Sequence, residues 1–179
     1  MTDAGDFGRR EPPAQADEQA TLVGYLDYQR ATFAWKCGGL DATALSATVA
    51  PSTMTLGGLL KHLALVEDWW FSCWLDDVDL AGPWAEVDFD ADPDWEWHSA
   101  AHDAPEHLYE TWRDAVARSR ANLERVLADR GLGGVARRSG RDGLAPSVRW
   151  IVLHMIEEYA RHNGHADLLR ESIDGQIGE

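Results

Sequence analysis

The chain has 179 residues, with 31 acidic against 16 basic residues and a formal net charge of −15. This charge repels phosphate backbones, and the densest basic run (Arg137, Arg138 and Arg141) lies in a glycine-rich segment, so the sequence argues against nucleic acid as a partner. No apolar run approaches the roughly 20 residues that span a bilayer, and the N-terminus does not resemble a signal peptide. We therefore expect a cytoplasmic protein without a membrane partner.

The periodicity of apolar residues predicts a helical protein. Residues 1–16 are polar and contain prolines, which predicts a flexible segment ahead of a single domain over residues 17–179. Helical spacing then predicts helices over residues 17–38, 55–75, 104–130 and 146–172. Asp103, followed three residues later by Glu106, resembles a capping box at the start of the third helix. Four amphipathic segments without a strand pattern predict an all-α protein, an antiparallel four-helix bundle.

The connection over residues 76–103 has no sustained period and is acidic. It carries three tryptophans, Trp84, Trp95 and Trp97. Loops of this length inside a compact domain are usually functional or disordered, and the aromatic content favours a loop that packs against the rest of the domain. We expect a long tryptophan-rich crossover that can shield a cleft from water.

Two of the predicted helices direct polar groups toward the interior. On a helical wheel of the fourth helix, His162 falls within the apolar stripe, and Glu158 lies about 60° to its side. In the second helix, His62 lies about 60° from the stripe centre at Leu59. A lone histidine on such a face is more often a hydrogen-bonded core residue, and a Glu–His pair can also satisfy itself as a buried ion pair. A divalent metal, by contrast, satisfies all three groups at once.

The fourth helix cannot supply a complete metal site by itself. His154, Glu158 and His162 are spaced i, i+4 and i+8, so the outer two residues are separated by about 12 Å along the axis. Bonds from a metal to its ligands are close to 2 Å long, and a third ligand must therefore come from another element. Among the other histidines, His62 lies well inside a predicted helix. The predicted ligands are His62, Glu158 and His162.

Two motifs also resemble a known family. The stretches GGLLKHLALVEDWWF and RWIVLHMIEEYARHNGHADLLRE resemble the DinB-like, YfiT-like four-helix metalloenzymes, and the resemblance covers about residues 17–175. The nearest branch is related to the metal-binding domain of mycothiol-dependent maleylpyruvate isomerase. The resemblance implies a divalent ion, usually zinc, held by His62, Glu158 and His162. It gives no ligand role to His165.

The resemblance also implies a reaction. The isomerase has a further C-terminal domain, whereas this sequence ends soon after the second motif, so relatives that join a low-molecular-weight thiol to an electrophile are the better guide. We expect a zinc-dependent transferase that activates a thiol, by this branch mycothiol, for attack on a small electrophile. The catalytic residues beyond the ligands stay unknown. A metal-dependent hydrolase, a metal-binding stress or sensor protein and a structural helical dimer module are the alternatives, and the sequence leaves a homodimer open.

Overall fold

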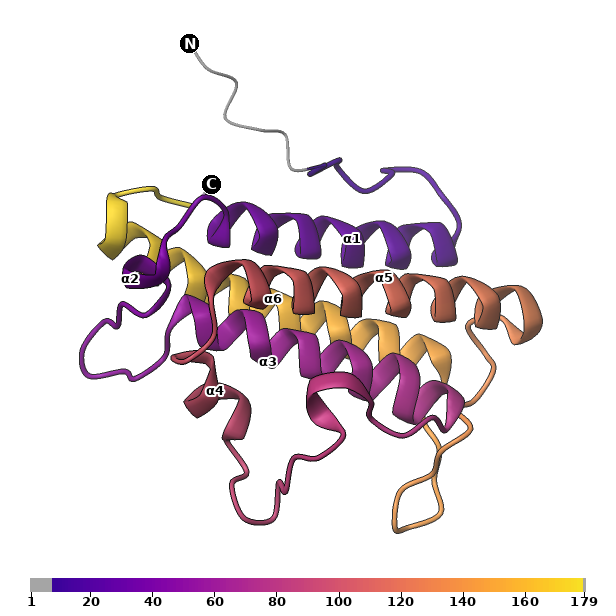
Figure 1. The fold of residues 1–179 in the computed structure, drawn as a ribbon. Coiled ribbons are helices and arrows are strands. Elements are labelled where there is room, and N and C mark those ends of the chain that lie inside the picture. Colours follow the sequence, from indigo (N-terminus) through magenta and orange to yellow (C-terminus); the bar gives the residue numbers. More distant parts are fainter. Residues whose placement is uncertain (1–7, 179) are drawn as a thin grey trace. The chain divides into compact units, whose positions relative to one another are not determined.

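The computed structural model describes residues 8–178, which form two compact units (Figure 1). One unit contains residues up to Leu56 and those from Val152 onward, and the other contains Gly57–Ile151. The predicted all-α class is confirmed, because the long elements are α1 (Glu18–Cys37), α3 (Leu56–Asp68), α5 (Pro105–Arg130) and α6 (Val148–Asp174). Three of them (α1, α5 and α6) match their predicted ranges to within two residues at each end, whereas α3 stops at Asp68 and a π-helix over Trp69–Trp74 occupies most of the rest of the predicted range 55–75. The described residues contain one isolated β-bridge, Val135 with Ser147, and no named strand.

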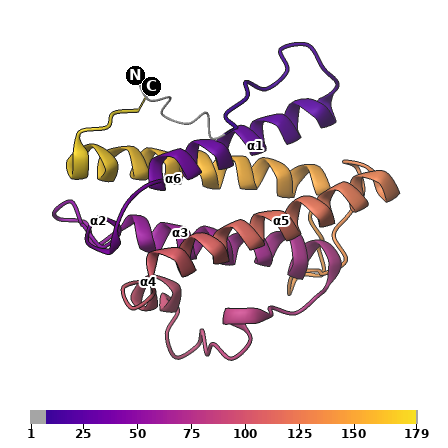
Figure 2. The same ribbon diagram turned by 45° about the horizontal axis from the view of Figure 1, so that its top comes forward.

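In the first unit, α1 and α6 lie side by side and run in the same direction (Figures 1 and 2). Polar side chains of α1 and α6 contact each other at several points along the C-terminal halves of the two helices. Asn163 donates from Nδ2 to Oε1 of Gln29 at 2.7 Å, and Lys36 forms an ion pair with Asp167 at 2.9 Å. Such side-chain contacts set the register of α6 on α1.

Arg170 holds the end of α1. Its Nη1 donates to the main-chain oxygens of Lys36, at 2.9 Å, and Gly38, at 2.8 Å. The last carbonyls of a helix have no partner within the helix, so a guanidinium satisfies them and also complements the helix dipole. Nearer the middle of α1, Phe33 meets Tyr159 edge to face, with ring centroids 6.1 Å apart.

The segment predicted to be flexible contributes one well-defined contact set. Residues 1–7 lie outside the described residues, but Arg9 donates to Thr32 at 3.2 Å and to the Tyr28 hydroxyl at 3.0 Å. Its guanidinium also lies 4.5 Å from the centroid of the Trp35 ring. Three contacts with α1 therefore tie the C-terminal part of this segment to the first unit.

In the second unit, α3 continues into a π-helix, η1 (Trp69–Trp74), and both run parallel to α5 (Figure 2). Ser119 donates to the main-chain oxygen of Glu67 at 3.3 Å, and Asn122 donates to that of Phe71 at 3.2 Å. The long crossover returns the chain to the end at which α3 began. Within each unit, the paired long helices of the described residues therefore run in the same direction, and the all-α architecture is consistent with a helical bundle.

The start of α5 differs from the prediction. The N-cap residue is Ala104, without a side-chain cap, and Asp103 instead forms an ion pair with Lys61 at 2.5 Å. The capping-box prediction was wrong because Asp103 pairs with Lys61, whose side chain is only 5% exposed, instead of capping the helix. A buried ammonium needs a counter-charge more than a helix end needs a cap, since an isolated buried charge costs several kcal/mol.

The crossover is more ordered than its sequence pattern indicated. It contains a short 3₁₀ turn, η2 (Gly82–Trp84), and a helix, α4 (Trp95–Ala100). Trp84 is buried, donates to Asp68 at 2.9 Å, and meets Trp95 edge to face at 6.2 Å. The expected packing of this loop on its surroundings is thus observed within the second unit. None of the helices in residues 8–178 combines the length and apolar character needed to cross a membrane.

Candidate metal centre

Glu158 and His162 lie on α6, one helical turn apart. The helix presents an apolar stripe to the interior, and His162 is buried within it at 6% exposure. The Glu158 side chain, on the flank of the stripe, is 16% exposed. Because side chains four residues apart meet on one side of a helix, the sequence spacing brings these two groups together. The stripe consists of Met155, Tyr159, Ala166 and Leu169.

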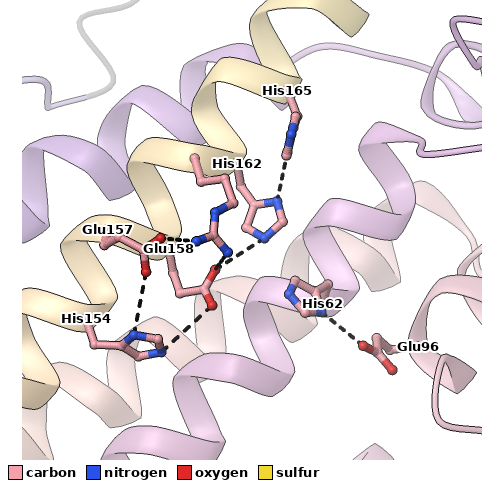
Figure 3. Close-up of polar contacts among 8 residues, drawn as sticks. His62, Glu96, His154, Glu157, Glu158, His162 and His165 are labelled. Atoms are coloured by element: carbon pink, nitrogen blue, oxygen red, sulfur yellow. Dashed lines mark hydrogen bonds and ion pairs between the residues drawn. The ribbon is translucent and has the colours of Figure 1, made fainter. Parts of the chain in front are cut away.

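The two donor groups face each other. Nε2 of His162 lies 3.5 Å from Oε2 of Glu158, at the outer limit of a hydrogen bond (Figure 3). This oxygen is buried and has no closer hydrogen-bond partner among residues 8–178. Two ligand atoms about 2 Å from one tetrahedral ion lie about 3.3 Å apart, so the observed separation fits a pair that shares an ion. The residues present therefore fit a divalent metal.

The environment keeps Glu158 in its ionised form. The contact with His162 lowers the pKa of this carboxyl, and the nearby His154 and Arg161 act in the same direction. Burial alone would raise the pKa, because it penalises the charged form. The hydrogen bond from His162 and the neighbouring positive charges outweigh the effect of burial, so the pKa of Glu158 is lowered. The ionised carboxylate is the form that binds a metal.

His165 holds His162 from the other side of its ring. The Nδ1 atoms of the two residues are 3.3 Å apart, so one ring donates and the other accepts (Figure 3). Burial, followed by the charges of His162 and Arg161, lowers the pKa of His165, which favours the neutral ring needed for such a pair. When His162 donates from Nδ1–H and His165 accepts, Nε2 carries the lone pair through which His162 would bind an ion.

A second group on α6 also has the spacing of a metal site. One potential ligand atom from each of His154, Glu157 and Glu158 lies within 4.8 Å of the others. Glu157, however, is half exposed and already forms an ion pair with Arg161. Glu158 directs Oε1 toward His154 at 3.8 Å and Oε2 toward His162. It is therefore common to both groups, and the more buried partner, His162, makes the stronger candidate.

His62, the third predicted ligand, belongs to the second unit. Its Nδ1 lies 3.0 Å from Oε1 of Glu96, a residue of α4 whose side chain is 6% exposed. The ring of Trp97 stacks on the His62 ring, with centroids 4.7 Å apart and planes inclined by 26°. His62 is thus held by a carboxylate and an aromatic face, and its Nδ1 contact assigns any ligand role to Nε2.

The comparison with known families agrees with the resemblance seen in the sequence. A family model for mycothiol-S-transferase matches residues 21–175, which is most of the chain. The chain belongs to the mycothiol-S-transferase family. This is a DinB-like family, and membership implies an S-transferase activity related to mycothiol. A comparison with curated proteins returned no match.

Within this mycothiol-S-transferase family member, several polar residues near the motif have structural partners. Asn163 is buried against Gln29, and Arg161 is exposed and pairs with Glu157. Burial raises the pKa of the Cys73 thiol to about 11 and that of Cys37 further still, so both stay protonated near neutral pH. None of these residues therefore presents an obvious catalytic group.

Sequence reasoning missed Glu96. It lies in the aperiodic crossover, 34 positions from His62, and no spacing rule connects the two residues. The one available signal was the pattern Trp95-Glu96-Trp97, a carboxylate between two aromatic residues, which is unusual for a solvent-exposed loop. Only the docking of α4 within the second unit shows its contact.

Proposed function

We propose that this protein is a metal-dependent S-transferase that joins the thiol of mycothiol to a small electrophile. His62, Glu158 and His162 would hold the divalent ion, for which we propose zinc. The observation that carries the proposal is the facing pair of Glu158 and His162 on α6, in a chain that belongs to the mycothiol-S-transferase family. Imidazole and carboxylate donors are a natural ligand set for zinc.

The ligand set suits a catalytic rather than a structural ion. Three protein ligands leave one coordination position for a substrate, whereas structural zinc is usually held by four. When bound, such an ion supplies positive charge that favours the thiolate form of a thiol next to it. Glu158 contributes one negative charge, so a divalent ion would keep a net positive charge toward an incoming anionic sulfur.

The nucleophile is assigned to the substrate thiol and not to the protein. Both cysteines are buried, and a protonated buried thiol is a poor nucleophile. In the proposed transfer, the thiol loses its proton to solvent and the sulfur lone pair forms a bond to carbon. With an alkyl halide or an epoxide, the leaving oxygen or halide takes the electrons of the bond that breaks; with an activated alkene, the π electrons move to the neighbouring carbon, which then takes a proton from solvent. We also propose a cytoplasmic location for this reaction.

The proposal is tested with protein of known metal content. Purified protein is stripped with a chelator, reloaded with zinc and assayed for loss of mycothiol thiol groups against a panel of alkyl halides, epoxides and activated alkenes. We expect thiol consumption with zinc, none after chelation, and recovery on reloading. Glutathione and bacillithiol, under the same conditions, should react more slowly than mycothiol.

Two outcomes favour the alternatives. Turnover of an ester or amide without any thiol indicates a metal-dependent hydrolase, in which water takes the place of the thiol. Zinc-loaded protein that consumes no thiol across the whole panel indicates a metal-binding stress or sensor protein. A protein that binds no divalent ion overturns the metal part of the proposal.

A further inference from the structure

Glu96 is a buried carboxylate that the proposed reaction does not yet use. Its side chain is 6% exposed, and Oε1 lies 3.0 Å from Nδ1 of His62. The second oxygen, Oε2, is buried and has no hydrogen-bond partner among residues 8–178. A carboxylate in such surroundings carries a high desolvation cost, so its contact with His62 must supply much of the compensation.

The contact is geometrically well defined. Trp97, the next residue in α4, stacks on the His62 ring at 4.7 Å, so the imidazole plane is held against an aromatic face. On the other side of Glu96, the Trp95 ring lies 4.4 Å from Nζ of Lys61, the residue that precedes His62. The tripeptide Trp95-Glu96-Trp97 therefore contacts two successive residues of α3: Trp95 contacts Lys61, and both Glu96 and Trp97 contact His62. This fixes both the position and the tilt of the His62 ring.

We propose that Glu96 is the positioning residue for His62. It accepts a hydrogen bond from Nδ1–H, fixes the tautomer in which Nε2 carries the lone pair, and so prepares Nε2 to bind the metal. The inference rests on the proposed function for its purpose, but the tautomer itself exists without a metal. Histidines that bind metals commonly donate their other N–H to a carboxylate, which orients the ring and makes the ligand more basic.

A metal on His62 would in turn strengthen the contact between His62 and Glu96. A cation on Nε2 withdraws electron density from the imidazole and makes Nδ1–H a stronger donor, which offsets the burial of the Glu96 charge. Metal binding and the His62–Glu96 contact therefore support each other. We expect the loss of Glu96 to weaken metal binding although Glu96 itself touches no metal.

The same crossover offers a matched control. His98 and Asp92 are also 3.0 Å apart through Nδ1, but the His98 side chain is 67% exposed and that of Asp92 is 37% exposed. Water can replace either partner there at little cost. Asp92→Asn therefore removes the carboxylate charge from a His–carboxylate contact of equal length, in the same segment, without changing a buried group.

The experiment compares the parent with Glu96→Ala, Glu96→Gln and Asp92→Asn. Zinc affinity is measured by competition with a chromophoric chelator, and the tautomer of His62 in metal-free protein is measured by ¹⁵N NMR of the imidazole at a pH where the ring is neutral. We expect Glu96→Ala to weaken zinc binding about 10- to 100-fold. Glu96→Gln, which keeps an oxygen acceptor, should weaken it less, and Asp92→Asn should leave it unchanged.

The tautomer measurement separates the inference from the proposed function. In metal-free parent protein we expect Nδ1–H at His62, and in Glu96→Ala a shift toward Nε2–H. A parent with Nε2–H at His62, or a tautomer unaffected in both Glu96 variants, overturns the inference even if zinc binds. If the parent binds no zinc but shows the Glu96-dependent tautomer, the positioning role stands and the metal proposal fails. If Glu96→Ala does not fold, the tautomer of the parent and the zinc affinity of Glu96→Gln are the readouts: Nε2–H in the parent, or a Glu96→Gln affinity equal to that of the parent, overturns the inference.

Discussion

The two histidines proposed as metal ligands are held in position in different ways. His162 is held from its own helix, by Glu158 at 3.5 Å and His165 at 3.3 Å, four and three residues away. His62 is held from a distant segment, by Glu96 at 3.0 Å from α4 and by the stacked ring of Trp97. The first arrangement needs only a helix. The second needs the whole crossover to fold back correctly.

The His162 arrangement is therefore the more robust of the two. Contacts between i and i+3 or i+4 form whenever α6 forms, because helix geometry alone brings those side chains together. A contact between residues 34 positions apart depends on every interaction that docks α4. Four experiments test this difference between the two histidines, starting with the substitutions that should weaken zinc binding most.

The largest effect is expected from removing a ligand. His62→Ala, Glu158→Ala and His162→Ala should each weaken zinc binding by more than about 100-fold, beyond the 10- to 100-fold typical of an orienting residue. Chelator competition and elemental analysis measure this. His107→Ala, which changes an exposed histidine of α5, is the control. If His154→Ala abolishes binding and His162→Ala does not, the ion is held by His154, Glu157 and Glu158.

The next effect concerns the distant arrangement. Asp103→Asn removes the counter-charge of Lys61, whose side chain is 5% exposed, at the point where the crossover joins α5. Leaving a buried charge without its partner should lower the free energy of unfolding by about 3 kcal/mol, the low end for a buried pair, because the Asp103 side chain is 21% exposed. Urea denaturation followed by tryptophan fluorescence measures the change. Asp92→Asn should cause no measurable change, and a Lys61–Asp103 pair that proves equally dispensable would refute this account of the crossover.

A smaller effect is expected in the local arrangement. His165→Ala removes the partner of Nδ1 of His162, but His165 is only partly buried, so water can take over the hydrogen bond. We expect zinc affinity to fall about tenfold or less, at the low end for an orienting residue. His165→Gln, which can still hydrogen-bond, should lose less. A loss as large as that of His162→Ala would instead identify His165 as a ligand.

The smallest effect is a dependence of stability on pH. The contact with His162 lowers the pKa of Glu158 below its ordinary value of 4.5, so the ionised carboxylate stabilises the folded state above that value. This contribution is lost as the pH falls through the lowered pKa. In metal-free protein, Glu158→Gln should lower the free energy of unfolding by about 1 kcal/mol at neutral pH and by much less in acid. A difference that is independent of pH would show that Glu158 does not titrate as the contact requires.

The all-α class, the existence of four long helical segments and the Glu158–His162 pair could be predicted from the sequence alone. All of these depend on the 3.6-residue period, which a linear pattern records directly. The prediction failed at Asp103, where the local capping rule was overridden by the buried charge of Lys61. It also did not anticipate that α3 and α5 run in the same direction, because helical periodicity carries no information about direction.

The contacts that hold His62, by contrast, could be seen only in the folded protein. Glu96 and Trp97 lie in a segment without periodicity, and their contacts with His62 arise from the fold of the crossover within the second unit. A sequence can indicate that a tryptophan-rich acidic loop packs against something, as this one did. Which carboxylate reaches which imidazole depends on long-range packing, since no spacing rule links residues so far apart in the chain.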